Sequence, residues 1–175
     1  MNHHQLCLLT ITILLMAGQA IGQDESGMEN LDHKIERHLH SKMPGWDYRS
    51  GEPIQGSKGE RIQTWTISNR GIRIAMTCSK SAAEAKEHIQ NFMKEVKGEP
   101  LEGFGDNAFL WGFDGSDLEV RRGRCIFDLN AGADVLRDAD ASTLTPSERN
   151  ARAKSEVRRI LTTFAKHVVD AVDAP

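Results

Sequence analysis

Two closely spaced turn signals between residues 107 and 130 constrain the fold more than any other feature of this chain. Asp114-Gly115 is a strong signal for a two-residue hairpin, and Arg122-Gly123 is a weaker one. The first turn pairs Trp111 with Leu118, and the second pairs Val120 with Cys125. Read independently, both turns place the same apolar residues on one face: Phe109, Trp111, Leu118, Val120, Cys125, Phe127 and Leu129. Because a one-residue slip would scatter that set, the agreement predicts a three-stranded antiparallel meander.

The same register makes a prediction for the outer face of the meander. It places Asp117 opposite Asp128 and Arg121 opposite Arg124, with Leu110 and Ile126 between them. Like charges that face each other across strands destabilise a sheet slightly. One interpretation is plain solvation of this face, and the other is a binding surface that is acidic at one end and basic at the other.

The rest of the chain predicts a second hairpin and three helices. Apolar and polar residues alternate along 61–68 and along 72–78, on either side of Asn69-Arg70-Gly71, as in a hairpin. Capping boxes at Ser81 and Thr145 begin helices that run to about Lys97 and about Val172, and residues 28–42 carry an earlier apolar stripe. Residues 45–60, with Trp46 and Ile54 as anchors, and residues 131–144 read as connections. The expected fold is α+β, an antiparallel sheet made of a hairpin plus a three-stranded meander, with helices packed on one face.

The first twenty-two residues have the features of an export signal. They contain no charged side chain, and an apolar run from Leu6 to Ala17 is followed by the small residues Gly18, Ala20 and Gly22. The run is too short to cross a bilayer, although an uncleaved membrane anchor is the alternative. We therefore predict a signal peptide at 1–22, an N-terminal helix and loop at 23–60, an α+β core at 61–175, and a secreted or periplasmic location with no integral membrane span after cleavage.

The exported chain would keep two cysteines, Cys78 and Cys125. Each ends on the apolar face of its strand, and the predicted compartment is oxidising. The two can form a disulfide only if their strands lie side by side, because Cα atoms more than about 7 Å apart cannot be bridged. The alternative is a pair of buried thiols that act as small apolar side chains.

Charge and motifs exclude several function classes. The net charge of −3 and the pI near 6.2 do not favour nucleic acid or an anionic membrane as a partner. The segment Gly51-x4-Gly56-Ser57-Lys58 imitates a phosphate-binding loop, but it inverts the Lys-Ser/Thr order and precedes a strand. The sequence contains no serine-hydrolase elbow and no zinc-protease motif, so we expect no enzyme and no cofactor.

One side of the first helix carries a possible metal site. His33, Glu36 and His40 follow an i, i+3, i+7 spacing, which places them on one face opposite the apolar stripe. Imidazole and carboxylate groups in this pattern could bind a transition metal, whereas the alternative is a solvated helix face. His38, His88 and His167 lie at the edges of apolar stripes and read as packing residues.

From the first hairpin to the last helix, the chain resembles small exported bacterial domains of unknown function. The resemblance rests on a strand, a Ser-capped Ala/Glu-rich helix, a basic hairpin, a terminal helix and the stretch Gly103-Phe104-Gly105-Asp106-Asn107-Ala108-Phe109-Leu110. Such domains are often tethered by a lipidated cysteine, which this chain lacks. The resemblance implies an α+β fold and carries over no catalytic residue.

Three interpretations of function follow from the sequence. The first is a non-catalytic binding or accessory module with a protein as a possible partner. The second is a metal-binding protein that uses His33, Glu36 and His40. The third is an unrecognised hydrolase, which would require a deep pocket with two carboxylates of divergent pKa.

Overall fold

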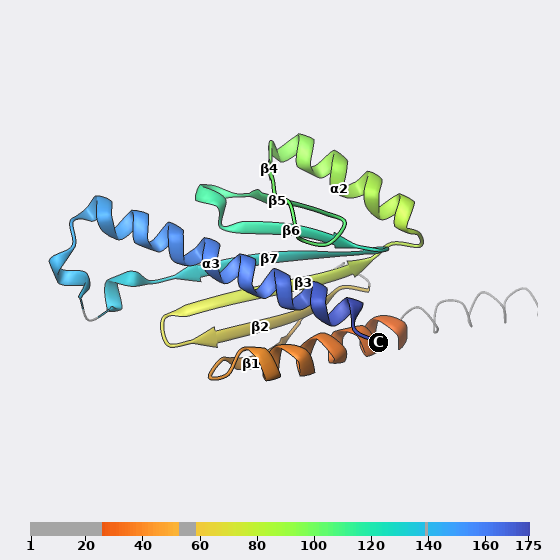
Figure 1. The fold of residues 1–175 in the computed structure, drawn as a ribbon, viewed down its shortest axis with the longest axis horizontal. Coiled ribbons are helices and arrows are strands. Elements are labelled where there is room, and N and C mark those ends of the chain that lie inside the picture. Colours follow the sequence, from red (N-terminus) through yellow and green to blue (C-terminus); the bar gives the residue numbers. More distant parts are fainter. Residues whose placement is uncertain (1–25, 53–58, 139) are drawn as a thin grey trace, which may run out of the picture.

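The structure is a computed structural model that describes residues 26–52, 59–138 and 140–175. Within these residues, seven strands form one antiparallel sheet in the order β1-β2-β3-β7-β6-β5-β4 (Figure 1). The strands are β1 Asp47–Gly51, β2 Arg61–Ile67, β3 Arg70–Cys78, β4 Glu99–Pro100, β5 Asn107–Trp111, β6 Asp117–Arg122 and β7 Cys125–Ala133. The helices are residues 26–42, α2 Ala82–Val96 and α3 Pro146–Asp173, with short 3-10 turns η1 Phe113–Gly115, η2 Val135–Arg137 and η3 Ala141–Thr143. The α+β class and the antiparallel sheet are confirmed, whereas the predicted signal peptide at 1–22 and Ile54 lie outside the described residues.

The helices cover both faces of the sheet rather than one. Helix 26–42 and α3 pack on the face that carries Trp65, Phe127 and Leu129. In contrast, α2 packs on the opposite face, against Phe109 and Ile126. Figure 1 shows α3 crossing the sheet, with helix 26–42 beside the β1–β2 edge and α2 beside the β4–β5 edge. The expectation of a single covered face fails because β5 and β7 present apolar side chains on both faces.

The first hairpin forms, but its turn begins one residue earlier than Asn69-Arg70-Gly71 predicts. Strands β2 and β3 pair Trp65 with Ile72 and Ile67 with Arg70, so Ser68 and Asn69 make a two-residue turn. Trp65 and Ile72 therefore share the face that α3 covers, and both are buried. Residues 47–51, which read as a loop in the sequence, instead add β1 to the edge of this hairpin.

In the meander, the β5–β6 register differs from the prediction by one residue. Leu110 lies opposite Leu118, and Trp111 lies opposite Asp117. The turn is a five-residue loop containing η1 rather than a two-residue Asp-Gly turn, and Gly112 enters it at φ +75°. Side chains rarely tolerate this positive φ, so the early bend favours glycine at position 112.

The one-residue difference moves Phe109 and Trp111 to the α2 face. The β6–β7 register differs by two residues, with Val120 opposite Phe127 rather than Cys125, so both strands keep their predicted faces. The core under α3 contains Leu118, Val120, Cys125, Phe127 and Leu129. The predicted polarised outer surface is also wrong. Leu110 is buried on the α3 face, α2 covers Ile126, and Asp117 faces Asn130 rather than Asp128.

Both predicted helix starts are confirmed. The Ser81 hydroxyl accepts the Glu84 amide at the start of α2. Thr145 and Glu148 form a reciprocal capping box before α3, with Pro146 at its first position. Because these caps depend only on residues within one turn, the sequence alone locates them.

Candidate functional site

The candidate functional site is a cavity of about 380 Å³ between α2 and the segment that leads into β5. Ile89, Gln90 and Met93 line it from α2, and the chain from Pro100 to Phe109 forms the rest of the wall. Ile89 and Phe109 belong to the small apolar cluster beneath α2, so the floor of the cavity is apolar. Gln90 is exposed on α2 and lies on the wall with Glu102 and Asn107, which adds polar groups around that floor.

The Gly103-x-Gly105-Asp106 stretch builds one wall of this cavity. Gly105 adopts φ +57°, and a Cβ atom there would lie 2.4 Å from the Arg121 carbonyl oxygen. Glycine therefore lets the backbone approach β6 closely, and the Asp106 amide donates to that same carbonyl at 2.8 Å. The motif that carries the resemblance thus has a structural role, which is to hold this wall against the sheet.

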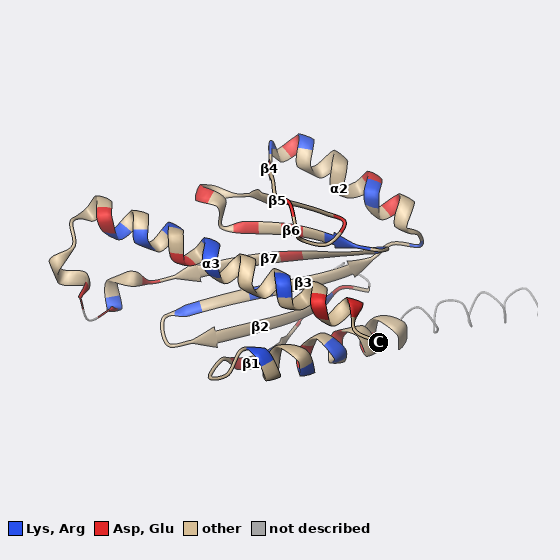
Figure 2. Cartoon of the chain, in the orientation of Figure 1, with Lys and Arg blue, Asp and Glu red and all other residues tan. Residues whose placement is uncertain are grey.

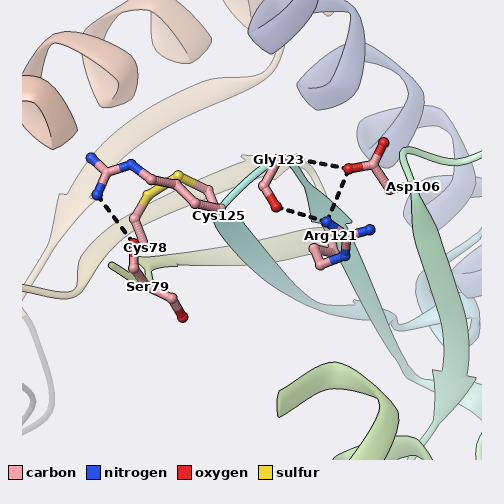
Figure 3. The surroundings of a disulfide bond; sticks show 7 residues. Cys78, Ser79, Asp106, Arg121, Gly123 and Cys125 are labelled. Atoms are coloured by element: carbon pink, nitrogen blue, oxygen red, sulfur yellow. Dashed lines mark hydrogen bonds and ion pairs between the residues drawn. A yellow bond between two sulfur atoms is a disulfide. The ribbon is translucent and has the colours of Figure 1, made fainter. Parts of the chain in front are cut away.

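The Asp106 carboxylate fastens the wall to the β6–β7 turn. It accepts the Gly123 amide at 2.8 Å, and Arg121 Nη1 lies 3.1 Å away (Figure 3). It also accepts Arg122 Nη1 at 2.7 Å. Burial alone would raise the pKa of Asp106, but the Gly123 and Arg122 hydrogen bonds and the two arginine charges lower it below its usual value. The carboxylate therefore stays ionised and bound, so the cavity wall has a fixed anchor.

The disulfide lies on the other side of the same turn. Cys78 and Cys125 are opposite each other on β3 and β7, with Cα atoms 4.0 Å apart, and their sulfurs are bonded. Ser79 donates its amide to the Arg124 carbonyl at 2.9 Å and accepts Arg124 Nη1 at 3.1 Å. Figure 3 shows the turn held between these contacts and Asp106. The strand pairing that the predicted disulfide required is present.

A pair of carboxyl groups lies elsewhere on the α2 face. Glu119 is opposite Asp128 across β6 and β7, and Glu119 is only 5% exposed. Burial, and then the charges of Asp128 and Asp117, raise the pKa of Glu119 to about 8. Burial, followed by Asp117, raises the pKa of Asp128 to about 6, although Arg73 opposes this. Neither Glu119 nor Asp128 lines the cavity, so this cavity does not combine the two features that the hydrolase interpretation requires.

The three predicted metal ligands lie along one side of helix 26–42. His33 Nδ1 is 3.2 Å from Glu36 Oε2, and His40 Nε2 is 3.9 Å from Glu36 Oε1. The carboxylate thus lies between the two imidazoles, while the His40 ring also packs edge-on against Trp65, with ring centroids 4.8 Å apart. A metal bound by this trio stays a prediction.

Sequence reasoning missed the cavity and a second histidine group. The cavity forms because α2 packs on the face opposite α3. The sequence had predicted that all helices pack on one face. The second group consists of His38, His167 and Asp170, whose ligand atoms converge between helix 26–42 and α3. The sequence signal for it was the position of both histidines at the edges of apolar stripes, where two packed helices can bring them together.

Comparisons of the chain with protein-family models, with curated proteins and with solved structures find no match. Over residues 26–52, 59–138 and 140–175, no helix has the length and apolarity needed to cross a membrane.

Proposed function

We propose that this protein is an exported, non-catalytic binding module whose ligand site is the cavity between α2 and residues 100–109. The observation that carries the proposal is the cavity itself, which has an apolar floor, polar groups around it and an anchored wall. Its volume lies at the lower end of the range for small-ligand pockets, about 300–1,000 Å³. The occupant we propose is a small amphipathic molecule, free or as the end of a larger partner.

The lining favours particular ligand chemistry. An apolar body would contact Ile89, Met93 and Phe104, all of which line the cavity. The charge that Asp106 brings is already offset by Arg121 and Arg122, which leaves Glu102 as the carboxylate available to a ligand. A neutral or cationic polar end therefore suits the site better than an anionic one.

The test is a fragment screen by NMR on the exported protein labelled with ¹⁵N. We expect neutral and cationic amphipathic fragments to shift the amide signals of Ile89, Met93 and Asn107 in a saturable way. Gln90→Trp places an indole at the cavity and should abolish these shifts. Glu87→Trp, three residues earlier on the exposed side of α2 and outside the lining, is the matched control and should leave them intact. Saturable shifts confined to another surface, or shifts unaffected by Gln90→Trp, would disprove the proposed site.

Two features support an exported protein whose partner is not a nucleic acid. The Cys78–Cys125 disulfide is compatible with an oxidising compartment. Acidic residues also interrupt the basic ones along α2 and α3 (Figure 2), which does not favour the uniformly basic helix typical of nucleic-acid binding.

A further inference from the structure

A second group of potential ligands lies between two helices that are distant in the sequence. His38 belongs to helix 26–42, and His167 and Asp170 belong to α3. One ligand atom from each of these three side chains lies within 4.8 Å of the other two. The two imidazole rings have centroids 5.9 Å apart and planes tilted by 52°.

Each of the two imidazoles has a buried ring nitrogen that makes no hydrogen bond within the described residues. Over the described residues, neither His38 Nε2 nor His167 Nδ1 has a hydrogen bond, although both atoms are shielded from solvent. Buried polar atoms without partners are rare, because each gives up its bonds to water and receives nothing in return. A bound cation would supply the missing partner for both nitrogens at once.

The third potential ligand, the Asp170 carboxylate, already has one hydrogen-bond donor. Asp170 Oδ2 lies 3.8 Å from His167 Nδ1, while the same oxygen accepts Lys166 Nζ at 2.8 Å. Two ligands of a tetrahedral zinc ion with bonds of about 2.0–2.1 Å lie about 3.4 Å apart, so side-chain rotation must bring the three ligand atoms closer than their present separation of up to 4.8 Å.

We propose that His38, His167 and Asp170 form a zinc site that joins helix 26–42 to α3, with water as the fourth ligand. Two imidazoles and one carboxylate are a donor set typical of Zn²⁺. This site is separate from the proposed ligand cavity, and it differs from the His33, Glu36 and His40 trio, which lies along a single helix.

The experiment measures zinc binding by competition with a chromophoric chelator, on exported protein purified without an affinity tag. We expect one saturable site, and we expect saturating zinc to raise the melting temperature. The double variant His38→Gln/His167→Gln should lose both effects. The control His33→Gln/His40→Gln makes the same two histidine-to-glutamine changes, both on helix 26–42, and should retain them.

Two single variants keep the test decisive if the double variant does not fold. Asp170→Asn alters a side chain that is 42% exposed, and it should weaken zinc binding without unfolding the protein. Lys166→Gln removes the ammonium that competes for Asp170, so it should strengthen binding. The proposal is overturned if the wild type shows no saturable zinc binding, if the control variant loses it, or if Asp170→Asn and Lys166→Gln both bind as the wild type does.

Discussion

The buried Glu119 carboxyl should make this protein less stable as the pH rises from mildly acidic to mildly basic. Burial, with Asp128 and Asp117 nearby, raises its pKa from 4.5 to about 8 in the folded state. Between these two pH values the folded state keeps a proton that the unfolded state has lost. The free energy of unfolding therefore falls as the pH rises through this window and is level above it. Asp128 adds a smaller effect of the same sign between pH 3.8 and about 6.

The perturbation is Glu119→Gln, which replaces the protonated carboxyl with a neutral group of similar shape. At about 1.36 kcal/mol per pKa unit, the raised pKa of Glu119 lowers the free energy of unfolding of the wild type by about 3 kcal/mol at pH 7. Because the coupled Asp128 carboxyl can relax, we expect a gain of about 1–3 kcal/mol for Glu119→Gln at pH 8. The amide could also donate to Asp128 Oδ1, a buried oxygen without a hydrogen-bond partner among the described residues.

The assay is urea unfolding at intervals from pH 4 to pH 9, with the disulfide intact and the free energy extrapolated linearly to water. Wild type and Glu119→Gln should be nearly equal at pH 4 and should diverge as the pH rises. Glu95→Gln makes the same change at an exposed position of α2 and serves as the control. A Glu119→Gln protein that is less stable than wild type at pH 8, or a difference that does not vary with pH, would refute the reasoning.

Three further perturbations test the core, the disulfide and the anchor of the cavity wall. Phe127→Ala should cost about 3–5 kcal/mol in urea unfolding, because Phe127 is fully buried under α3, whereas the partly exposed Trp111→Ala should cost less. Equal losses would contradict the difference in burial between these two side chains. Reductant, or Cys78→Ala, should lower the free energy of unfolding by up to about 4 kcal/mol, since the bond closes a 47-residue loop; thiol titration of the unfolded, unreduced protein that finds two free thiols would disprove the bond. Asp106→Asn should cost about 1–3 kcal/mol and broaden the NMR signals of residues 101–106, because it weakens the contacts to Arg122 and the Gly123 amide; unchanged signals would show that the wall holds without the carboxylate.

The helices and the first hairpin were predictable because their signals are local. The Thr145 capping box operates within one turn, and the two-residue turn after Ile67 preserves the alternation on both of its strands. The β5–β6 register was not predictable in this way. Strand β5 has four successive apolar residues, from Ala108 to Trp111. Its pattern therefore does not show which side chains point to the α3 face of the sheet and which to the α2 face. The β5–β6 register is then set by the length of the loop, and the Asp-Gly pair lies inside a longer loop that begins at Gly112.

The candidate sites were harder to predict because each depends on how elements pack. The sequence draws attention to the Gly103–Asp106 stretch, but only the position of α2 on the second face turns that stretch into the wall of a cavity. His38 and His167 meet because α3 and helix 26–42 pack on the same face of the sheet, with Lys34 Nζ donating to the Ala174 carbonyl at 2.7 Å. No local spacing encodes a contact between side chains 129 residues apart.

The disulfide and the cavity wall meet at the β6–β7 turn, which raises the question of whether reduction would disturb ligand binding. Reduction removes one link at Cys125, but the turn keeps the Ser79 amide bond to Arg124 and the Asp106 contacts. The β3–β7 ladder also continues from Cys78 to Arg70, so the strands stay paired along their length. Because a disulfide acts mainly by constraining the unfolded chain, its loss should reduce the fraction of folded protein and leave the cavity of the folded molecules unchanged. An oxidising compartment therefore matters to the lifetime of the fold, while the shape of the proposed binding site depends on Asp106.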